Sequence, residues 1–359
     1  MKNKKIRVAI LFGGKSAEHE VSIQSAKNVY NSLDKKKYDV SLIGIDKKGD
    51  WHLCPEQYLL DASFSQQKVL DAMDTVSLST KDGTRGLVTA SLSQPIDVVF
   101  PILHGPFGED GSMQGLLKLA NIPFVGSGVL GSAVAMDKDV AKRLLRDAGL
   151  PISQFLVYRK GDTISFAEVT KKLGLPCFVK PANLGSSVGV SKVQTEKELK
   201  KAVEDAFAYD TKILIEEFIP GREIECSVLG NEDPIVSIPG EIIAIHDFYS
   251  YEAKYLDENG ANLNIPANLS PEKIKEVQAL ALKTFSVLCL EGMARIDCFF
   301  TPDEKFYINE ANTIPGFTNI SMYPKLWEAS GISYSELVDR LIELALQRHK
   351  GQQELKTTL

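Results

Sequence analysis

The sequence predicts a mixed α/β protein of more than one domain, whose N-terminal part is built on a parallel sheet. Its 359 residues exceed what one hydrophobic core usually serves, so two or three domains are expected. Apolar strand-like runs alternate with amphipathic helical segments through the first third of the chain. Glycine-containing loops follow these runs, and in a parallel sheet such loops place functional residues at the carboxyl ends of the strands.

The expected N-terminal domain covers residues 1–126. Its strands are expected over residues 7–12, 38–45, 96–103 and 123–126. The first strand leads into Gly13-Gly14 and then a helix that carries Ala26, Val29 and Leu33 on one face. A second helix is expected after Gly111. Residues 55–95 match no clear element and are expected to form a peripheral excursion.

Two segments mark the expected boundaries of the later domains. The small-residue stretch 127–136 precedes a central domain over residues 127–220, and Pro220-Gly221 precedes a C-terminal domain over residues 221–359. The central domain is expected to contain a helix over 138–148 and strands over 177–180 and 212–219, with a Gly/Ser loop between the strands. The C-terminal domain is expected to mix strands with a long polar loop over 246–264 and to end in a helix over 334–349.

Composition excludes several classes of function. No apolar stretch approaches the roughly 18 residues of a membrane-spanning helix, and the apolar run after the basic N-terminus is too short for a signal peptide. A cytoplasmic protein without membrane contact is therefore expected. The net charge of −6 disfavours a nucleic-acid partner, which needs a clustered basic surface. The five cysteines are scattered without a C-x-x-C pair, so neither a zinc site nor a disulfide framework is expected.

Residues 293–317 contain the strongest candidate site. Two strand-like runs flank the turn residues 301–305, which predicts a β-hairpin. Residues two apart on a strand share a face, so Arg295 lies with Asp297 and Glu310 lies with Asn312. A four-residue loop predicts three cross-strand pairs: Thr301 with Phe306, Asp297 with Glu310, and Arg295 with Asn312.

This hairpin predicts a site for a divalent cation. Cross-strand neighbours on one face lie about 5 Å apart at Cβ, and two adjacent carboxylates repel unless a cation lies between them. Oxygen ligands without sulfur or imidazole suit Mg²⁺. The alternative is a surface hairpin with an Arg–carboxylate pair. The Asn-Thr-Ile-Pro-Gly turn that follows favours the site, because such a turn allows close approach of the backbone.

The segment FVKPANLGSSVGV at 178–190 is a candidate anion-binding loop. A strand delivers Lys180, and Gly185 and Gly189 bracket Ser186-Ser187, whose backbone N–H groups and hydroxyls can surround an anion. It is not a GxxxxGK[ST] loop, because the lysine precedes the glycines. A flexible hairpin turn is the alternative, and Lys138, a further candidate at a helix start, could simply be solvated.

Three further segments have both a functional and a structural interpretation. Residues 216–219 end a strand and could hold a nucleotide base through their backbone, with Glu223 on the ribose, or they could belong to an ordinary edge strand. Glu18 and His104 follow the first and third strands and would suit the ammonium and carboxylate of a zwitterion, although His104 could be a structural cap. The loop 246–260 has three tyrosines and a lysine, typical of a lid or of tyrosines packed at a loop base.

Together these segments resemble the D-alanine–D-alanine ligase family of the ATP-grasp superfamily. The resemblance runs over nearly the whole chain, through FGGKSAEHEVS, LHGPFGEDGSMQG, MDK, VKPANLGSSVG, FYSYEAKY, RIDCFF, NEANTIPGFT and SMYPKLW. It implies a three-domain ATP-grasp fold, in which two α+β domains that follow the parallel α/β domain enclose ATP. It also implies that ATP converts one D-alanine to an acyl phosphate, which the amine of a second D-alanine attacks, to make a peptidoglycan precursor.

The resemblance implies a role for each candidate residue. ATP would contact Lys138, Lys180, Ser187, Glu216, Glu217, Phe218, Ile219, Glu223 and Asn309. Two Mg²⁺ or Mn²⁺ ions would bind Asp297, Glu310 and Asn312. Substrate would be bound by His104, Lys254, Ser321 and Met322. The catalytic residues would be Glu18, Ser186, Tyr255, Arg295 and Gly316, with Arg295 and the Gly316 backbone stabilising the oxyanion.

Specificity and assembly are also implied by the resemblance. Tyr255 at the lid position accompanies dipeptide formation in this family, so D-alanine is the expected second substrate. A homodimer is expected, and activation by a monovalent cation is left open. Two other functions remain as alternatives: an ATP-grasp ligase for a different carboxylate–amine pair, and a nucleotide-binding regulator that has lost the chemistry. The intact set of lysines and metal ligands disfavours the regulator.

Overall fold

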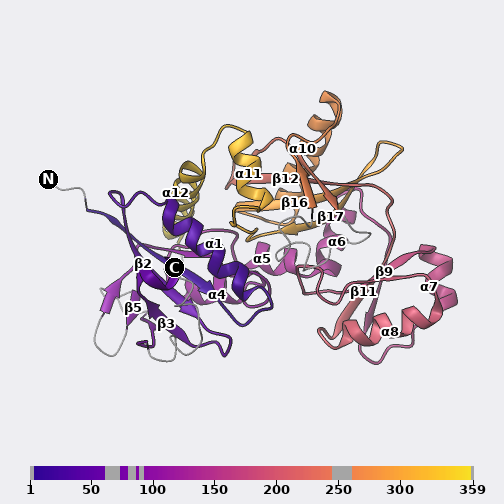
Figure 1. The fold of residues 1–359 in the computed structure, drawn as a ribbon, viewed down its shortest axis with the longest axis horizontal. Coiled ribbons are helices and arrows are strands. Elements are labelled where there is room, and N and C mark those ends of the chain that lie inside the picture. Colours follow the sequence, from indigo (N-terminus) through magenta and orange to yellow (C-terminus); the bar gives the residue numbers. More distant parts are fainter. Residues whose placement is uncertain (1–3, 61–72, 80–85, 89–92, 245–260, 357–359) are drawn as a thin grey trace.

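The computed structural model describes residues 4–60, 73–79, 86–88, 93–244 and 261–356 (Figure 1). Three larger sheets follow one another along the chain, and a small three-stranded sheet lies beside the first. Lys254 and Tyr255, together with the rest of the expected lid loop over 246–260, lie outside the described residues. Among the described helices, none combines the length and apolar character that a membrane crossing requires.

The N-terminal sheet has the strand order β3 (Trp51–Cys54), β2 (Tyr38–Ile45), β1 (Ile6–Gly13) and β7 (Val98–Pro101). The pairs β1–β2 and β1–β7 are parallel, as predicted, and β3 is an antiparallel edge strand. The prediction of a fourth strand over 123–126 is wrong, because only an isolated bridge joins Phe124 to Val99. Pro123 has no N–H for a ladder, and Gly126 turns the chain away with a φ of +93°.

Helices cover this sheet and lead away from it. Their bounds are α1 (His19–Ser32), α2 (Glu56–Leu60), α4 (Ser112–Leu119) and α5 (Val129–Met136). As predicted, α1 buries Ala26 and Val29, and Leu33 directly after it is also buried. The described part of the expected excursion contains α2 and an antiparallel sheet of β4 (Ser77–Ser79), β5 (Gly86–Val88) and β6 (Ser93–Pro95).

The central sheet is antiparallel and has a core of its own. Its strand order is β10 (Ser191–Val193), β9 (Cys177–Pro181), β11 (Lys212–Glu217) and β8 (Phe155–Arg159). The helices α7 (Phe166–Leu173) and α8 (Glu196–Phe207) pack on it, at the end of the molecule far from the N-terminal sheet (Figure 1). A capping box of Thr195 and Glu198 begins α8. The helix α6 (Lys138–Asp147) precedes this unit.

The C-terminal sheet has the strand order β15 (Ala261–Asn264), β14 (Gly240–Ala244), β12 (Arg222–Gly230), β16 (Gly292–Phe300) and β17 (Phe306–Asn312), and β13 (Ile235–Val236) also pairs with β12. Its helices are α10 (Pro271–Val287), α11 (Met322–Ala329) and α12 (Tyr334–Gln353). Ser270 caps α10, and Pro271 occupies its first turn, where a missing N–H costs nothing.

The last helix joins the C-terminal sheet to the N-terminal one. Residues of α12, β1, β7 and β16 share one hydrophobic core, in which the rings of Phe100 and Phe317 lie 6.2 Å apart, edge to face. Near its end, the buried Arg348 donates hydrogen bonds to the carbonyl oxygens of Gly126 and of Phe124, the latter at 2.8 Å. This packing holds the N-terminal loops against the β16–β17 hairpin, and the two regions together form one wall of the site.

Candidate functional site

All candidate residues that the structure describes line one cavity with a volume of about 540 Å³. It lies between the central sheet, the β16–β17 hairpin and the loops at the end of the N-terminal sheet. The candidate residues in its wall are Glu18, His104, Lys138, Lys180, Ser186, Ser187, Glu216, Glu217, Phe218, Ile219, Glu223, Arg295, Asp297, Asn309, Glu310, Asn312, Gly316, Ser321 and Met322. The chain therefore brings together, from three sheets, residues that are up to about 300 positions apart.

The predicted register of the β16–β17 hairpin agrees with the structure at the residues that form the site. Arg295 pairs with Asn312 and Asp297 with Glu310, so both predicted pairs are confirmed. The predicted pair of Thr301 with Phe306 is wrong, because Phe306 pairs with Phe300. The register shifts by one residue between Asp297 and Cys298, where β17 contains a β-bulge.

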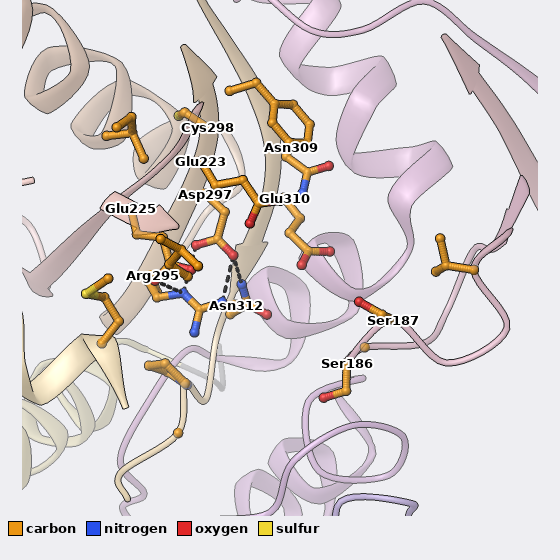
Figure 2. A pocket seen from close by; sticks show the side chains of 18 of the residues that line it. Ser186, Ser187, Glu223, Glu225, Arg295, Asp297, Cys298, Asn309, Glu310 and Asn312 are labelled. Atoms are coloured by element: carbon orange, nitrogen blue, oxygen red, sulfur yellow. Dashed lines mark hydrogen bonds and ion pairs between the residues drawn. The ribbon is translucent and has the colours of Figure 1, made fainter. Parts of the chain in front are cut away.

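The bulge explains why adjacent residues of one strand line the same cavity. Cys298 pairs with Ile308 and Asp297 with Glu310, so Asn309 is the additional residue. In a regular strand Asn309 and Glu310 would point to opposite faces. Here both line the cavity, while Ile308 is buried in the core. Figure 2 shows the two side chains next to each other.

Arg295 and Asp297 form a forked ion pair at the centre of the hairpin (Figure 2). Arg295 Nε and Nη2 each donate a hydrogen bond of 2.7 Å to Asp297, and Asn312 Nδ2 donates one of 2.9 Å. Glu225 Oε2 also lies 3.0 Å from Nε, the nitrogen that donates to Asp297 Oδ1. Prediction from the sequence missed Glu225, although it lies two positions after Glu223 on the same strand face.

The donor set fits magnesium. Within the described part of the chain, no group of three or more His, Cys, Asp or Glu side chains is placed to hold a metal ion. Two carboxylates and one carboxamide line the cavity at Asp297, Glu310 and Asn312. Mg²⁺ typically takes one or two protein carboxylates and completes its octahedron with water and nucleotide phosphates. The residues therefore match such an ion and offer nothing that would select zinc.

Two lysines approach the cavity from the central part of the chain. Lys138 Nζ donates a hydrogen bond of 2.6 Å to the Leu184 carbonyl and lies 3.4 Å from Glu310 Oε2. Lys180 Nζ lies 2.7 Å from Glu216 Oε2. Asp137 caps α6 directly before Lys138 and is paired with Lys212 at 2.6 Å. This ion pair connects the start of α6 to β11, so the side chains of Lys138 and Lys180 approach the cavity in defined directions.

A third lysine, Lys142, was missed by prediction from the sequence. It is only 1% exposed and lies 3.4 Å from Glu216 Oε1 and 2.9 Å from Ser153 Oγ. Burial, only partly offset by Glu216, lowers the pKa of Lys142 to about 8. Burial alone would raise the pKa of Glu216, but Lys142 and Lys180 outweigh it and hold that pKa below its usual value. The signal was present in the sequence, because Lys142 is one helical turn after Lys138.

Replacing Lys142 with Met is expected to raise the free energy of unfolding near pH 7 by roughly 1 to 3 kcal/mol, because the cost of burying the ammonium group exceeds its attraction to Glu216, and Glu216 keeps Lys180 as a partner. Between pH 8 and 10.5 the unfolded chain binds a proton that the folded chain lacks. The stability of the wild type therefore rises across this window, and the advantage of Lys142→Met shrinks. The KM for ATP is expected to increase, because Glu216 loses a partner.

Urea unfolding at pH 7.5 and pH 10, together with ATP kinetics, measures these effects. Lys200→Met removes an exposed lysine that is also ion-paired, and it should change neither quantity. A Lys142→Met variant that unfolded more readily than the wild type at pH 7.5 would contradict the expectation.

The Gly/Ser loop reaches across to the N-terminal domain. Ser186 Oγ donates a hydrogen bond to Glu18 Oε1. Ser186 and Ser187 have φ values of +52° and +59°, which non-glycine residues adopt at an energetic cost. Opposite them, a Cβ on Gly105 would lie 2.7 Å from Glu18 Oε2. Glycine at position 105 therefore makes room for the carboxylate that the loop contacts.

His104 and Glu109 form hydrogen bonds to the loop that follows β17. The His104 ring nitrogens lie 3.2 Å from Ser25 Oγ and 2.9 Å from the Ile314 carbonyl oxygen, and burial lowers the histidine pKa. Glu109 accepts hydrogen bonds of 2.8 Å from the backbone N–H groups of Gly105 and Ile314. Burial, followed by the charge of Glu18, raises the pKa of Glu109 to about 8. Prediction from the sequence missed this acid, which lies five positions after His104.

The remaining candidates frame the two ends of the cavity. Ser321 Oγ accepts a hydrogen bond of 2.9 Å from the Thr318 N–H, and a Cβ on Gly316 would lie 2.7 Å from that oxygen. Met322 begins α11 and is buried. At the other end, Phe218 is 40% exposed, and its ring lies 6.0 Å from that of Phe178. These aromatic faces and the strand end beside them suit a planar base.

Comparisons with known proteins agree with this site. The family model described as D-ala D-ala ligase N-terminus matches residues 7–127, and D-ala D-ala ligase C-terminus matches residues 144–343. The chain belongs to the D-alanine–D-alanine ligase family. D-alanine–D-alanine ligase A of Escherichia coli strain K12 is 54% identical over 363 residues, covering 99% of this chain and 100% of the relative. The D-alanine–D-alanine ligase of Oceanobacillus iheyensis is 54% identical over 362 residues, covering 99% of each.

Solved structures of the family share the architecture. The D-alanine–D-alanine ligase from Coxiella burnetii superposes with a TM-score of 0.88 at 42% identity, covering 98% of this chain and 96% of that one. A D-Ala:D-Ser ligase from Enterococcus faecalis has a TM-score of 0.86 at 36% identity, covering 95% of this chain and 100% of that one. The fold is therefore the ATP-grasp fold of D-alanine–D-alanine ligases, and the chain is a ligase of this family. The shared architecture is compatible with more than one second substrate.

Proposed function

We propose that this ligase joins two D-alanines to D-alanyl-D-alanine, with ATP converted to ADP and phosphate, as a step in peptidoglycan precursor synthesis. The observation that carries the proposal is that lysines, carboxylates and loop residues from three sheets meet in a single cavity. The cavity is lined by Lys138 and Lys180 and by the carboxylates of Asp297 and Glu310, and Lys138 Nζ lies 3.4 Å from Glu310 Oε2. These charges suit a nucleotide whose phosphates are bound by lysines and by carboxylate-bound cations.

Each part of the cavity supplies one requirement of the reaction. Lys138 and Lys180 would neutralise phosphate charge, with Ser187 of the Gly/Ser loop close to the phosphates. Glu216, Glu217, Phe218 and Ile219 would hold the adenine, Glu223 the ribose, and Asn309 would contact ATP from the bulge. Glu18 and Ser186 would orient the ammonium of the first D-alanine. Arg295 and the Gly316 backbone would stabilise negative charge on the carbonyl oxygen when the amine attacks.

Asp297, Glu310 and Asn312 would hold two Mg²⁺ or Mn²⁺ ions, which supply charge neutralisation for the transferred phosphoryl group. Because Asp297 is hydrogen-bonded to Arg295 and Asn312, its carboxylate already has a fixed direction. Supporting the assignment, the bulge at Asn309 leaves Glu310 on the cavity side of β17, directly opposite Asp297.

The second substrate is proposed to be D-alanine. Its carboxylate would be received by Ser321 and by Lys254, with Met322 nearby, whereas His104 would face the carboxylate of the first D-alanine. Lys254 and the lid residue Tyr255 lie outside the described residues. The 54% identical relatives are D-alanine–D-alanine ligases, whereas the D-Ala:D-Ser ligase is more distant at 36%. A competition assay with D-alanine, D-serine and D-lactate near neutral pH tests this. Preference for D-serine or D-lactate would exclude the assignment.

A phosphate-release assay tests the reaction itself. The proposed ligase releases phosphate only when ATP, Mg²⁺ and D-alanine are all present, and mass spectrometry should detect the dipeptide. A nucleotide-binding regulator would release none upon addition of D-alanine. A ligase for another carboxylate–amine pair would respond to other amino acids in a panel but not to D-alanine alone. The same assay with and without K⁺ decides whether a monovalent cation activates the enzyme.

The enzyme is proposed to work as a homodimer in the cytoplasm, where ATP is available. Its division into residues 1–126, 127–220 and 221–359 is also a proposal. The central sheet has its own core, whereas Ala141 and Leu145 of α6 pack into the core of the C-terminal sheet. Linker composition alone would not reveal that α6 is shared in this way.

The dimer proposal predicts the effect of a surface substitution. Leu116 and Leu119 lie one turn apart on α4 and are 42% and 85% exposed, an arrangement that a second copy of the chain would cover. Leu119→Glu is expected to shift the protein from dimer to monomer in sedimentation velocity experiments. Leu175→Glu, at an exposed leucine outside α4, is the control and should leave the dimer intact. An unchanged dimer in Leu119→Glu would place the interface elsewhere.

A further inference from the structure

Three neighbouring strands place three carboxylates in one row. Glu225 on β12 pairs with Asp297 on β16, which in turn pairs with Glu310 on β17. Two residues further along the strands, Arg295 lies between Ser227 and Asn312. Glu225 is therefore on the opposite side of Asp297 from Glu310, the second proposed metal ligand.

Two carboxylates of this row, Asp297 and Glu225, both contact Nε of Arg295. Its Nε lies 2.7 Å from Asp297 Oδ1 and 3.0 Å from Glu225 Oε2, and its Nη2 lies 2.7 Å from Asp297 Oδ2. The Glu225 side chain is only 5% exposed, compared with 13% for Asp297. An ionised carboxylate at such a depth requires a cationic partner.

Arg295 and a divalent cation would compete for the same carboxylate. The guanidinium occupies both oxygens of Asp297, whereas a cation bound between Asp297 and Glu310 would need some of the same lone pairs. It would also repel the guanidinium electrostatically. If Asp297 alone compensated the charge of Arg295, metal binding would displace the arginine or be weakened by it.

We propose that Glu225 is a positioning residue that retains Arg295 when Asp297 binds the metal. It compensates the charge of the guanidinium from the side away from Glu310, so that Asp297 can serve the cation while Arg295 stays directed at the substrate. This inference rests on the proposed metal and oxyanion roles of Asp297 and Arg295. It adds Glu225 to these roles, as a residue that affects metal affinity indirectly, by its interaction with Arg295.

Mn²⁺ binding to the full-length protein in the presence of ADP tests the inference without catalysis. Free Mn²⁺ is followed by its electron paramagnetic resonance signal. Glu225→Gln keeps the size of the side chain and removes its charge. We expect roughly tenfold weaker Mn²⁺ binding, within the range of coupling measured between contacting charged residues. Glu291→Gln removes a carboxylate from a different arginine, Arg348, outside the cavity, and should bind Mn²⁺ like the wild type.

A double-mutant cycle separates an indirect effect from a direct one. In an Arg295→Met background, Asp297 has no competing guanidinium, so Glu225→Gln should no longer change Mn²⁺ affinity. Unchanged affinity in the single variant would overturn the inference. So would a loss of affinity that persisted in the Arg295→Met background, because Glu225 would then act on the metal directly. Failure of the underlying metal assignment is recognised separately, because Asp297→Asn would then bind Mn²⁺ like the wild type.

Discussion

Asp297→Asn and Glu310→Gln are each expected to reduce kcat/KM by about a thousandfold or more, at the upper end of what the loss of one transition-state electrostatic contact costs. Each substitution preserves side-chain volume and removes one of two carboxylates that face each other across β16 and β17. Phosphoryl transfer depends on neutralising charge that spreads over the phosphate oxygens. An amide in place of either carboxylate weakens the binding of the cations that provide this neutralisation.

The measurement is initial-rate kinetics with saturating D-alanine over a range of Mg²⁺ concentrations. Raised Mg²⁺ should restore part of the activity, because the defect lies in affinity for the ion. Asp303→Asn is a matched control on the same hairpin, since Asp303 is 61% exposed in the turn and paired with Lys305. It should keep wild-type activity. Turnover near the wild-type level in Asp297→Asn or Glu310→Gln would show that the metal assignment is wrong.

The hairpin shows what alternation along a strand can and cannot predict. The pairing of Asp297 with Glu310 was derived from a side-chain period of two and a loop of four residues. The loop between Phe300 and Phe306 has five residues, and the bulge in β17 offsets that difference, so the pairing at the site is still correct. The bulge was not predictable in this way, because it changes the register by one residue between the site and the turn. The error appeared at Phe306, on the turn side of the bulge. Asn309 was assigned to ATP by family resemblance, and the bulge supplies the physical reason that it lines the cavity beside Glu310.

Residues whose importance depends on distant partners were the ones missed. Lys142 looks like an ordinary surface lysine of an amphipathic helix, and only contact with Glu216, on a strand of the central sheet, explains its burial. Glu109 is one of several acids in its loop, and its role as an acceptor for the Ile314 N–H depends on the packing of two domains. Local patterns predicted the strands that deliver the site. They did not distinguish the charges that become buried from solvated ones: the spacing of Lys142 from Lys138 put it on the face of Lys138, but not in contact with Glu216.

Arg295→Met is expected to lower kcat by about a hundredfold to a thousandfold, as does the loss of a single oxyanion donor in other enzymes. The KM for ATP should change little, because the nucleotide contacts lie on other residues of the cavity. Arg295→Lys should recover only a small part of the loss, since an ammonium group cannot reproduce the fork that holds Asp297 while it also lies beside Glu225. Recovery of most of kcat in Arg295→Lys would show that charge alone is needed there.

Stability provides an independent test of the same residue. Without Arg295, the row of Glu225, Asp297 and Glu310 loses the cation that lies between two of its members, and removing one partner of a buried pair typically costs about 3 to 5 kcal/mol. Millimolar Mg²⁺ should therefore raise the urea midpoint of Arg295→Met more than that of the wild type, because an ion bound between Asp297 and Glu310 then offsets carboxylate repulsion without competing with a guanidinium for Asp297. Equal shifts in the two proteins would mean that Arg295 does not compete with the metal for Asp297, and the electrostatic coupling of oxyanion and metal sites would have to be abandoned.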